Sequence, residues 1–113
     1  MTDVWQVQVA APSKDAATTL ARSAVEARLA AGAQVVGPVT SVFWHQGEFG
    51  TGDEWQVLLK TTADAYADLE QHLVERHEWT NPEITALPLA AGLAPYLDWV
   101  RRTTSKQVGD AGH

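Results

Sequence analysis

Apolar and polar residues alternate in two stretches of the chain, residues 4–10 and 53–60. Strict alternation puts successive side chains on opposite faces of an extended segment, which is the pattern of a β-strand with one buried face. The second stretch also has an apolar residue, Leu58, on its polar face. We therefore expect a sheet with one buried face and one mixed face. The apolar faces carry Trp5, Val7 and Val9 in the first strand and Trp55, Val57 and Leu59 in the second.

A helical pattern follows the first strand. Pro12-Ser13 supplies a break and an N-cap, and small apolar residues then recur at helical spacing on one side. The pattern predicts a helix from about Lys14 to Ala31 that ends at Gly32, since glycine is the usual residue just beyond a helix. The side of this helix that is rich in alanine is expected to lie close against the sheet.

Two further helices are predicted. One begins after a capping threonine, Thr61 or Thr62, and runs to about Arg76, before the break that Pro82 imposes. The other is a terminal helix opened by Ala94-Pro95, because proline is well tolerated in the first turn.

A long β-hairpin is the most distinctive expectation. Residues 34–46 read as a strand bent at Gly37-Pro38, which is typical of a sheet edge, and a turn over Gly47–Gly52 leads to the strand at 53–60. One small domain has too few residues to cover so long and apolar a hairpin, so this segment indicates self-assembly. The residues expected at the interface between subunits are Phe43, Trp44 and Trp55.

With a short strand at Glu83–Leu89, the predicted order is βαββαβ followed by a C-terminal helix. This is the order of a ferredoxin-like α+β sandwich with both long helices on one face of an antiparallel sheet. The 113 residues form a single domain, 1–113, with a tail from about residue 105 that we expect to be flexible.

Composition excludes several kinds of partner. The net charge of −6 and the scattered basic residues argue against nucleic acid, whose binding needs clustered Lys and Arg. No apolar run approaches the length of a membrane-spanning helix. The first residues have neither a basic nor a long apolar segment, so a cytoplasmic location is expected. Without cysteine, a soft-metal site built on thiolates is not expected either.

Several short motifs, in one consistent order over roughly residues 4–100, resemble the CutA family, which is named for divalent-cation tolerance. They include the hairpin residues Trp44, Gly47 and Glu54 and the isolated His77. The others are Ala11-Pro12, Arg28-Leu29-Ala30-Ala31, Lys60-Thr61, Pro82-Glu83-Ile84, Leu87-Pro88 and Tyr96-Leu97-Asp98-Trp99.

The resemblance implies a homotrimer in which the long hairpins of adjacent subunits pair edge to edge. It also implies an association with copper and other divalent cations, and no enzymatic activity. Some CutA proteins resemble copper-binding proteins in having a cysteine and a His-His pair, at positions that correspond here to Val9, Arg76 and His77. Only His77 matches, so we expect at most weak binding of copper or another divalent cation, with His77 as the metal ligand.

Other interpretations stay open at this point. The alternative function is a PII-like small-ligand sensor or signalling scaffold with a site at the subunit boundary, for which Lys60, Glu83 and Glu54 are the candidate pocket residues. A third interpretation is an enzyme that uses His77 and Glu83 as an acid–base pair. For His77 itself, the structural alternative is a role at the C-terminal end of the preceding helix.

Overall fold

Four strands form one antiparallel sheet in the computed structural model of the chain, which describes residues 1–105. The sheet order is β2-β3-β1-β4. The predicted flexible tail falls almost entirely on residues 106–113, which lie outside the described residues. The bounds of the strands are Val4–Ala11 for β1, Gly32–His45 for β2, Glu48–Thr62 for β3 and Ile84–Pro88 for β4.

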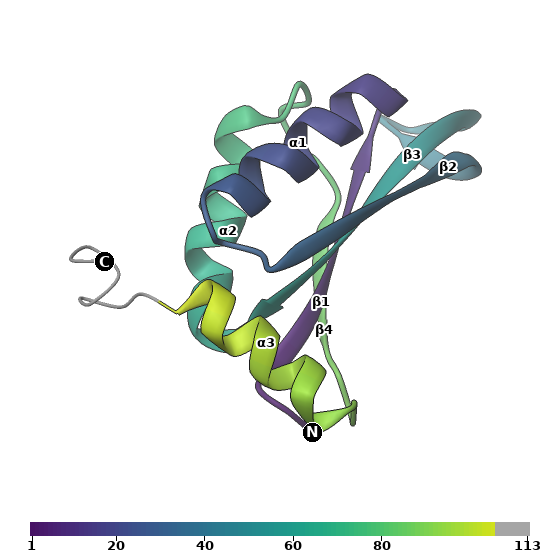
Figure 1. The fold of residues 1–113 in the computed structure, drawn as a ribbon. Helices are drawn as coiled ribbons and strands as arrows, with labels where there is room; N and C mark the ends of the chain where they lie inside the picture. The colour runs from purple at the N-terminus through teal and green to yellow at the C-terminus, as the bar shows by residue number, and fades with distance from the viewer. Residues whose placement is uncertain (106–113) are drawn as a thin grey trace.

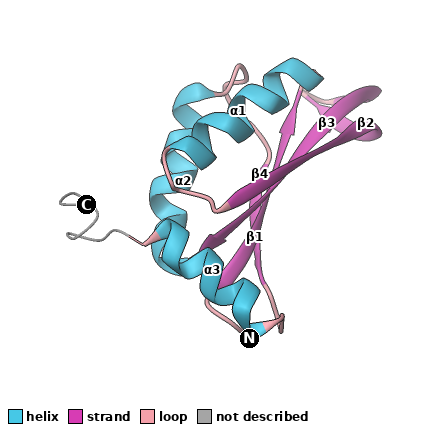
Figure 2. Cartoon of the chain, in the orientation of Figure 1, coloured by secondary structure: helices cyan, strands magenta, loops and turns pink. Residues whose placement is uncertain are grey.

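Two helices, α1 (Lys14–Glu26) and α2 (Ala63–Arg76), cover one face of this sheet (Figures 1 and 2). The order βαββαβ and the α+β class are confirmed. The main core lies between these helices and the apolar strand faces, and its largest fully buried side chains include Leu59, Leu69 and Leu73. The structure thus gives the sheet the buried face that the alternating pattern predicts.

The third helix, α3 (Ala94–Thr104), packs at one end of the opposite face. Its Leu97 and Val100 form a second apolar cluster with Val4 and Ala31. Since α3 covers only one end, the rest of this mixed face remains uncovered within the described chain. The prediction that a terminal helix begins at Ala94-Pro95 is confirmed.

The first helix ends five residues earlier than expected, at Glu26 instead of Ala31. The amide of Leu29 donates to the carbonyl of Ala24, and the amide of Arg28 donates to that of Val25. These two bonds form a Schellman motif, in which the residue beyond the cap is left-handed and usually glycine. Here that residue is Arg28, with φ of 60°, at a cost of about 1 kcal/mol relative to glycine. Sequence analysis missed this end because no glycine marks it.

The hairpin turn is also shorter than predicted. The strands pair as far as His45 and Glu48, so the turn consists of Gln46 and Gly47, both with positive φ. Positive φ at both central residues is the signature of a tight turn that matches the twist of the strands. Gly50 and Gly52, which we expected in the turn, belong to β3.

The ring of Phe43 explains why these strand glycines are accommodated. A Cβ atom on Gly50 would stand 3.1 Å from Cε1 of Phe43, and one on Gly52 would stand 4.0 Å from Cε2. The phenyl ring therefore lies over the bare backbone of β3 and replaces the missing side-chain packing.

The prediction of a bent edge strand is confirmed, since β2 is at the sheet edge and its pairing with β3 shifts between Val36 and Val39. At this bulge Trp55 packs so closely on Gly37 that a Cβ atom there would stand 2.6 Å from the indole ring. A side chain at position 37 would thus displace Trp55.

The contact between α1 and α2 contains a histidine that responds to pH. The Ser23 hydroxyl donates to the carbonyl of Leu20, so its oxygen accepts from Nε2 of His72 at 3.0 Å. Burial, with a smaller contribution from Arg76, lowers the pKa of His72 below its ordinary value of 6.5.

We expect the protein to lose a small part of its stability as the pH falls through 6.5. Because the folded-state pKa of His72 is lower than the unfolded one, the unfolded chain binds the proton more readily, and His72 contributes fully only above pH 6.5. The difference between the urea midpoints at pH 8 and pH 5 should be smaller in His72→Gln than in the parent protein. Glutamine keeps a hydrogen-bond donor near Ser23 but has no group that titrates in this range. An unchanged difference would assign the pH response to another group.

Candidate functional site

His77 lies at the C-terminal end of α2 with both ring nitrogens engaged. Its Nε2 donates to the backbone carbonyl of Ala10 at 2.6 Å, and its Nδ1 accepts from the amide of Trp79 at 3.0 Å. The indole ring of Trp79 lies beside the imidazole, with 5.1 Å between centroids. His77 therefore ties the loop after α2 to the end of β1. A metal at either nitrogen would have to replace one of these hydrogen bonds, because coordination uses a ring lone pair.

Glu83 lies close to His77 in the fold, but not through its carboxylate. The amide of Ala10 donates to the backbone carbonyl of Glu83 at 3.2 Å, so both residues bond to the same residue of β1. The Glu83 side chain is exposed, and His77 has no ion pair within the described residues. The arrangement holds a loop in place and gives no geometric support to an acid–base pair.

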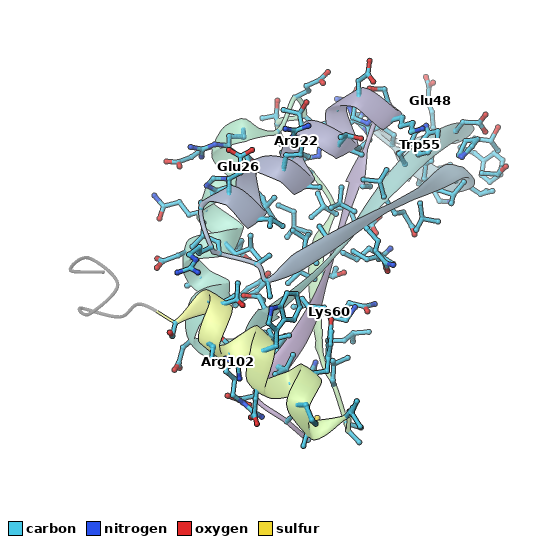
Figure 3. The ribbon with its side chains drawn as sticks, viewed as in Figure 1. Arg22, Glu26, Glu48, Trp55, Lys60 and Arg102 are labelled. Carbon is cyan, nitrogen blue, oxygen red and sulfur yellow. The ribbon has the colours of Figure 1, made fainter. Side chains whose placement is uncertain are left out.

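Lys60 lies at the other end of the sheet. It is in register with Gln6 of β1, four residues from Ala10, which corresponds to about 13 Å along the strand. Figure 3 shows Lys60 next to α3, away from Glu48 and Trp55 at the hairpin end. Within one chain, the structure does not bring Lys60 together with His77 and Glu83.

The Lys60 side chain is half-buried on the mixed face of the sheet. It makes no hydrogen bond or ion pair with any other described residue. Gly32, its cross-strand neighbour, lies beneath the ring of Trp99, whose Cη2 would be 3.5 Å from a Cβ atom there. An ammonium group at the edge of α3 is thus left for solvent or for a group from outside the described chain.

Glu54, the remaining pocket candidate, has a partner in its own hairpin. Its Oε1 accepts from the hydroxyl of Ser41 at 2.7 Å. Glu54 is one residue beyond Trp55, where β1 stops pairing with β3. It therefore belongs to the protruding part of the hairpin and lies six residues along β3 from Lys60.

The three predicted interface aromatics have different environments. Trp55 packs on Gly37 and the main core, with Nζ of Lys14 6.0 Å from its ring centroid. Phe43 covers the β3 glycines. Only Trp44 is largely exposed, at 74%, and its ring meets that of Phe49 edge to face with 5.7 Å between centroids.

Sequence analysis missed Phe49 because the predicted turn was too long. With the turn at Gln46-Gly47, Phe49 pairs directly with Trp44 across the hairpin. Val42 is two residues from Trp44 and shares its face of the strand. Val42 and Phe49 are each 63% exposed, so the tip carries an apolar face. The dipeptide Gln46-Gly47 is the signal that would have placed the turn.

Among residues 1–105, no group of three or more His, Asp or Glu side chains is placed to hold a metal ion. In the same part of the chain, no helix is long and apolar enough to cross a membrane. Two cavities in this part of the chain are considered for a ligand. One of about 240 Å³ is lined by His77, Arg76 and the first turns of α1, and one of about 690 Å³ lies where α1, α2 and α3 meet.

Comparison with known proteins agrees with the predicted family. The model of the CutA1 divalent ion tolerance protein family matches residues 5–103. The divalent-cation tolerance protein CutA of Thermus thermophilus is 42% identical over 98 residues, which are 87% of this chain and 95% of that protein. The chloroplastic CutA 1 of Oryza sativa subsp. japonica is 35% identical over 87% of this chain, which spans only 55% of its length.

A solved structure of the divalent cation tolerance protein from Thermus thermophilus has the same fold. It superposes with a TM-score of 0.87 at 40% identity and covers 90% of this chain and 99% of its own. Fold, family model and sequence identity therefore agree over nearly all the described residues. This chain belongs to the CutA1 divalent ion tolerance family.

Proposed function

We propose that this protein is a non-enzymatic, cytoplasmic homotrimer that serves divalent metal tolerance and binds copper weakly. Its family name supports the link to metal tolerance. The assembly, the preference for copper and the compartment are our extensions of that name.

The observation that supports assembly most strongly is the overhanging hairpin. The ladder between β1 and β3 ends at the pair Ala11 and Trp55, so β2 and β3 continue beyond it with no strand of the described chain on either side (Figure 1). Unpaired strand edges with exposed apolar side chains promote association with other strands. Pairing of each hairpin with neighbouring copies would cover these edges and the Trp44–Phe49 face, and a ring of three closes such head-to-tail contacts.

Weak copper binding follows from the environment of His77. We propose His77 as the protein ligand, with solvent or a carboxylate from another subunit completing the coordination. Since a metal must displace a hydrogen bond to Ala10 or Trp79, part of the coordination energy is offset. Affinity is therefore expected to be low.

Calorimetric titration with Cu(II) tests this assignment. We expect weak binding by the parent protein and at least about tenfold weaker binding by His77→Ala, which corresponds to the loss of about 1.4 kcal/mol. His45→Ala is the matched control, because His45 is exposed at the hairpin tip. Equal binding by parent and His77→Ala would remove His77 as a ligand, and no binding by the parent would contradict the copper proposal. Circular dichroism of each variant checks that the fold persists.

A second candidate function is a small-ligand sensor or scaffold of the PII-like kind. The half-buried Lys60 beside α3 favours it, because a cation without a partner in the described chain suits an anionic group brought by a ligand or a neighbouring subunit. Glu54 and Glu83 would enter such a site only from other subunits, since one chain keeps them apart from Lys60. If the parent protein bound no copper and were nevertheless a trimer, the result would favour this candidate.

A further inference from the structure

Most of the large apolar side chains that are exposed in the described chain gather at two ends of the molecule, the hairpin tip and the region where β4 leads to α3 (Figure 1). Among them are Val42, Trp44 and Phe49 in the hairpin, and Leu87, Tyr96 and Trp99 on β4 and α3. Exposed apolar patches mark contact surfaces. Two such patches on one chain can serve a single kind of contact, if the first patch of one copy meets the second patch of the next copy.

The hairpin patch points to the side of the sheet on which α1 and α2 lie. Phe49 and Asp53 are each an even number of residues from Trp55, which packs on the main core, so their side chains point to the same side. Trp44 pairs with Phe49, and Val42 shares the face of Trp44. We call Val42, Trp44, Phe49 and Asp53 the tip face. The exposed carboxylate of Asp53 makes no hydrogen bond or ion pair with another residue in the range 1–105.

The second patch lies on the opposite, mixed side of the sheet. Leu87 of β4 and Lys60 of β3 are both in register with Gln6 of β1, so their side chains stand in one row across the sheet. Trp99 covers the β2 end of the same row, and its ring meets that of Tyr96 with 5.6 Å between centroids. We call Lys60, Leu87, Tyr96 and Trp99 the receiving face. It combines exposed apolar side chains with one half-buried ammonium group.

The two faces are complementary in charge and comparable in spacing. On the tip face, Asp53 is about 7 Å along the hairpin from the row of Val42 and about 13 Å from that of Phe49. On the receiving face, Leu87 is two strands away from Lys60, at about 10 Å. Each face thus has one charge at a similar distance from apolar side chains. Because a half-buried ammonium group has lost part of its hydration, a carboxylate that arrives together with apolar surface suits it.

We propose that the tip face of one copy of this chain docks on the receiving face of the next, and that Asp53 of the first copy pairs with Lys60 of the second. The two faces point to opposite sides of the sheet, so copies in the same orientation can repeat the contact without being turned over. Such a head-to-tail contact closes a ring when the rotation between copies allows it. The contact rests on the proposed trimer and specifies the surfaces that form it.

Sedimentation velocity of charge-reversal variants tests the contact. Lys60→Glu and Asp53→Lys should each weaken self-association at least about tenfold, because each brings two like charges together. The combined variant Lys60→Glu/Asp53→Lys should sediment like the parent, since it restores the pair with the charges exchanged. Glu48→Lys is the matched control, because it reverses an acid of the hairpin tip that is next to Phe49 in β3 and therefore on the other face (Figure 3). It should also sediment like the parent.

The outcomes separate this contact from the trimer itself. A parent protein that sediments as a monomer would refute the trimer and, with it, the contact. A trimeric parent whose two single variants stay trimeric would overturn the contact alone. So would a combined variant that associates as weakly as the single variants, provided that circular dichroism shows it folded. Asp53→Lys changes an exposed side chain of the overhanging hairpin, so its fold is expected to persist.

Carbodiimide cross-linking locates the pair directly, because it joins a carboxylate to an amine only where the two are in contact. Isotope-labelled and unlabelled chains are refolded together from urea, cross-linked and digested. We expect a peptide pair that joins Asp53 to Lys60 and contains one labelled and one unlabelled member, which shows that the two residues belong to different copies. A trimer in which Lys60 is instead joined to Glu54 or Glu83 of another copy would overturn the assignment of Asp53.

Discussion

Replacing Trp44 and Phe49 together with aspartate is expected to turn the proposed trimer into folded monomers. Both side chains are largely exposed in the single chain, so the protomer loses little by the change. At a subunit contact, each aromatic side chain would contribute about 2 kcal/mol through burial, and an aspartate there would add an uncompensated charge. Sedimentation velocity at micromolar concentration measures the change directly.

The matched control is Val74→Asp, which introduces the same charge at an apolar residue of α2 that is 49% exposed. It should sediment like the parent. A parent protein that sediments as a monomer would refute the trimer. A double variant that stays trimeric would instead show that the subunits are held together elsewhere, for example by the uncovered sheet face.

The strands were predictable from sequence because their signal is local. In β1, the alternation of Trp5, Val7 and Val9 with glutamines fixes both the strand and its buried face, and the structure confirms them. A capping threonine at the start of α2, either Thr61 or Thr62, and Pro95 in the first turn of α3 follow from equally local chemistry. In each case the residue types within one short segment favour the backbone conformation that the structure shows.

The errors arose where the local signal points to the wrong residue. Gly32 resembles a helix end, but the backbone turns at Arg28, and Gly32 instead begins β2, beneath Trp99. Similarly, Gly50 and Gly52 resemble a turn, although the ring of Phe43 makes them part of a strand. The helix end follows from a local hydrogen-bond motif formed by a residue other than glycine, and the strand glycines pack against Phe43, so residue type alone predicts neither case.

The candidate site was harder to predict because it depends on register. The sequence nominates Lys60, His77 and Glu83 individually, but only the pairing of Gln6 with Lys60 shows how far Lys60 lies from the other two. The hydrogen bond from His77 to the carbonyl of Ala10 joins residues 67 positions apart. Spacing along the chain gives no access to such contacts.

Thr61 illustrates how two neighbouring threonines divide two roles. The sequence allows either Thr61 or Thr62 as the cap of α2, and Thr62 takes that role by accepting from the amide of Ala65 at 3.3 Å. Thr61 is fully buried, and its hydroxyl donates to the carbonyl of Leu29 at 2.7 Å. This bond anchors the loop that carries Arg28 to β3.

Thr61→Val is expected to lower the free energy of unfolding by about 2 kcal/mol. Valine has nearly the same shape, so packing is preserved, but the carbonyl of Leu29 loses the donor that a buried site must supply. Urea unfolding is best measured in the Trp44→Asp/Phe49→Asp background, so that assembly does not mask the stability of the protomer. The midpoint should fall with an unchanged slope.

Thr40→Val is the matched control, because Thr40 is exposed in the hairpin and its hydroxyl makes no hydrogen bond within residues 1–105. It should change stability by less than about 0.5 kcal/mol. If Thr61→Val were as mild as Thr40→Val, the hydroxyl would not anchor the loop. The Schellman motif, which is a local feature, would then be sufficient to hold Arg28 in position. A large loss of unfolding free energy in Thr61→Val would instead show that β3 also holds this loop in place.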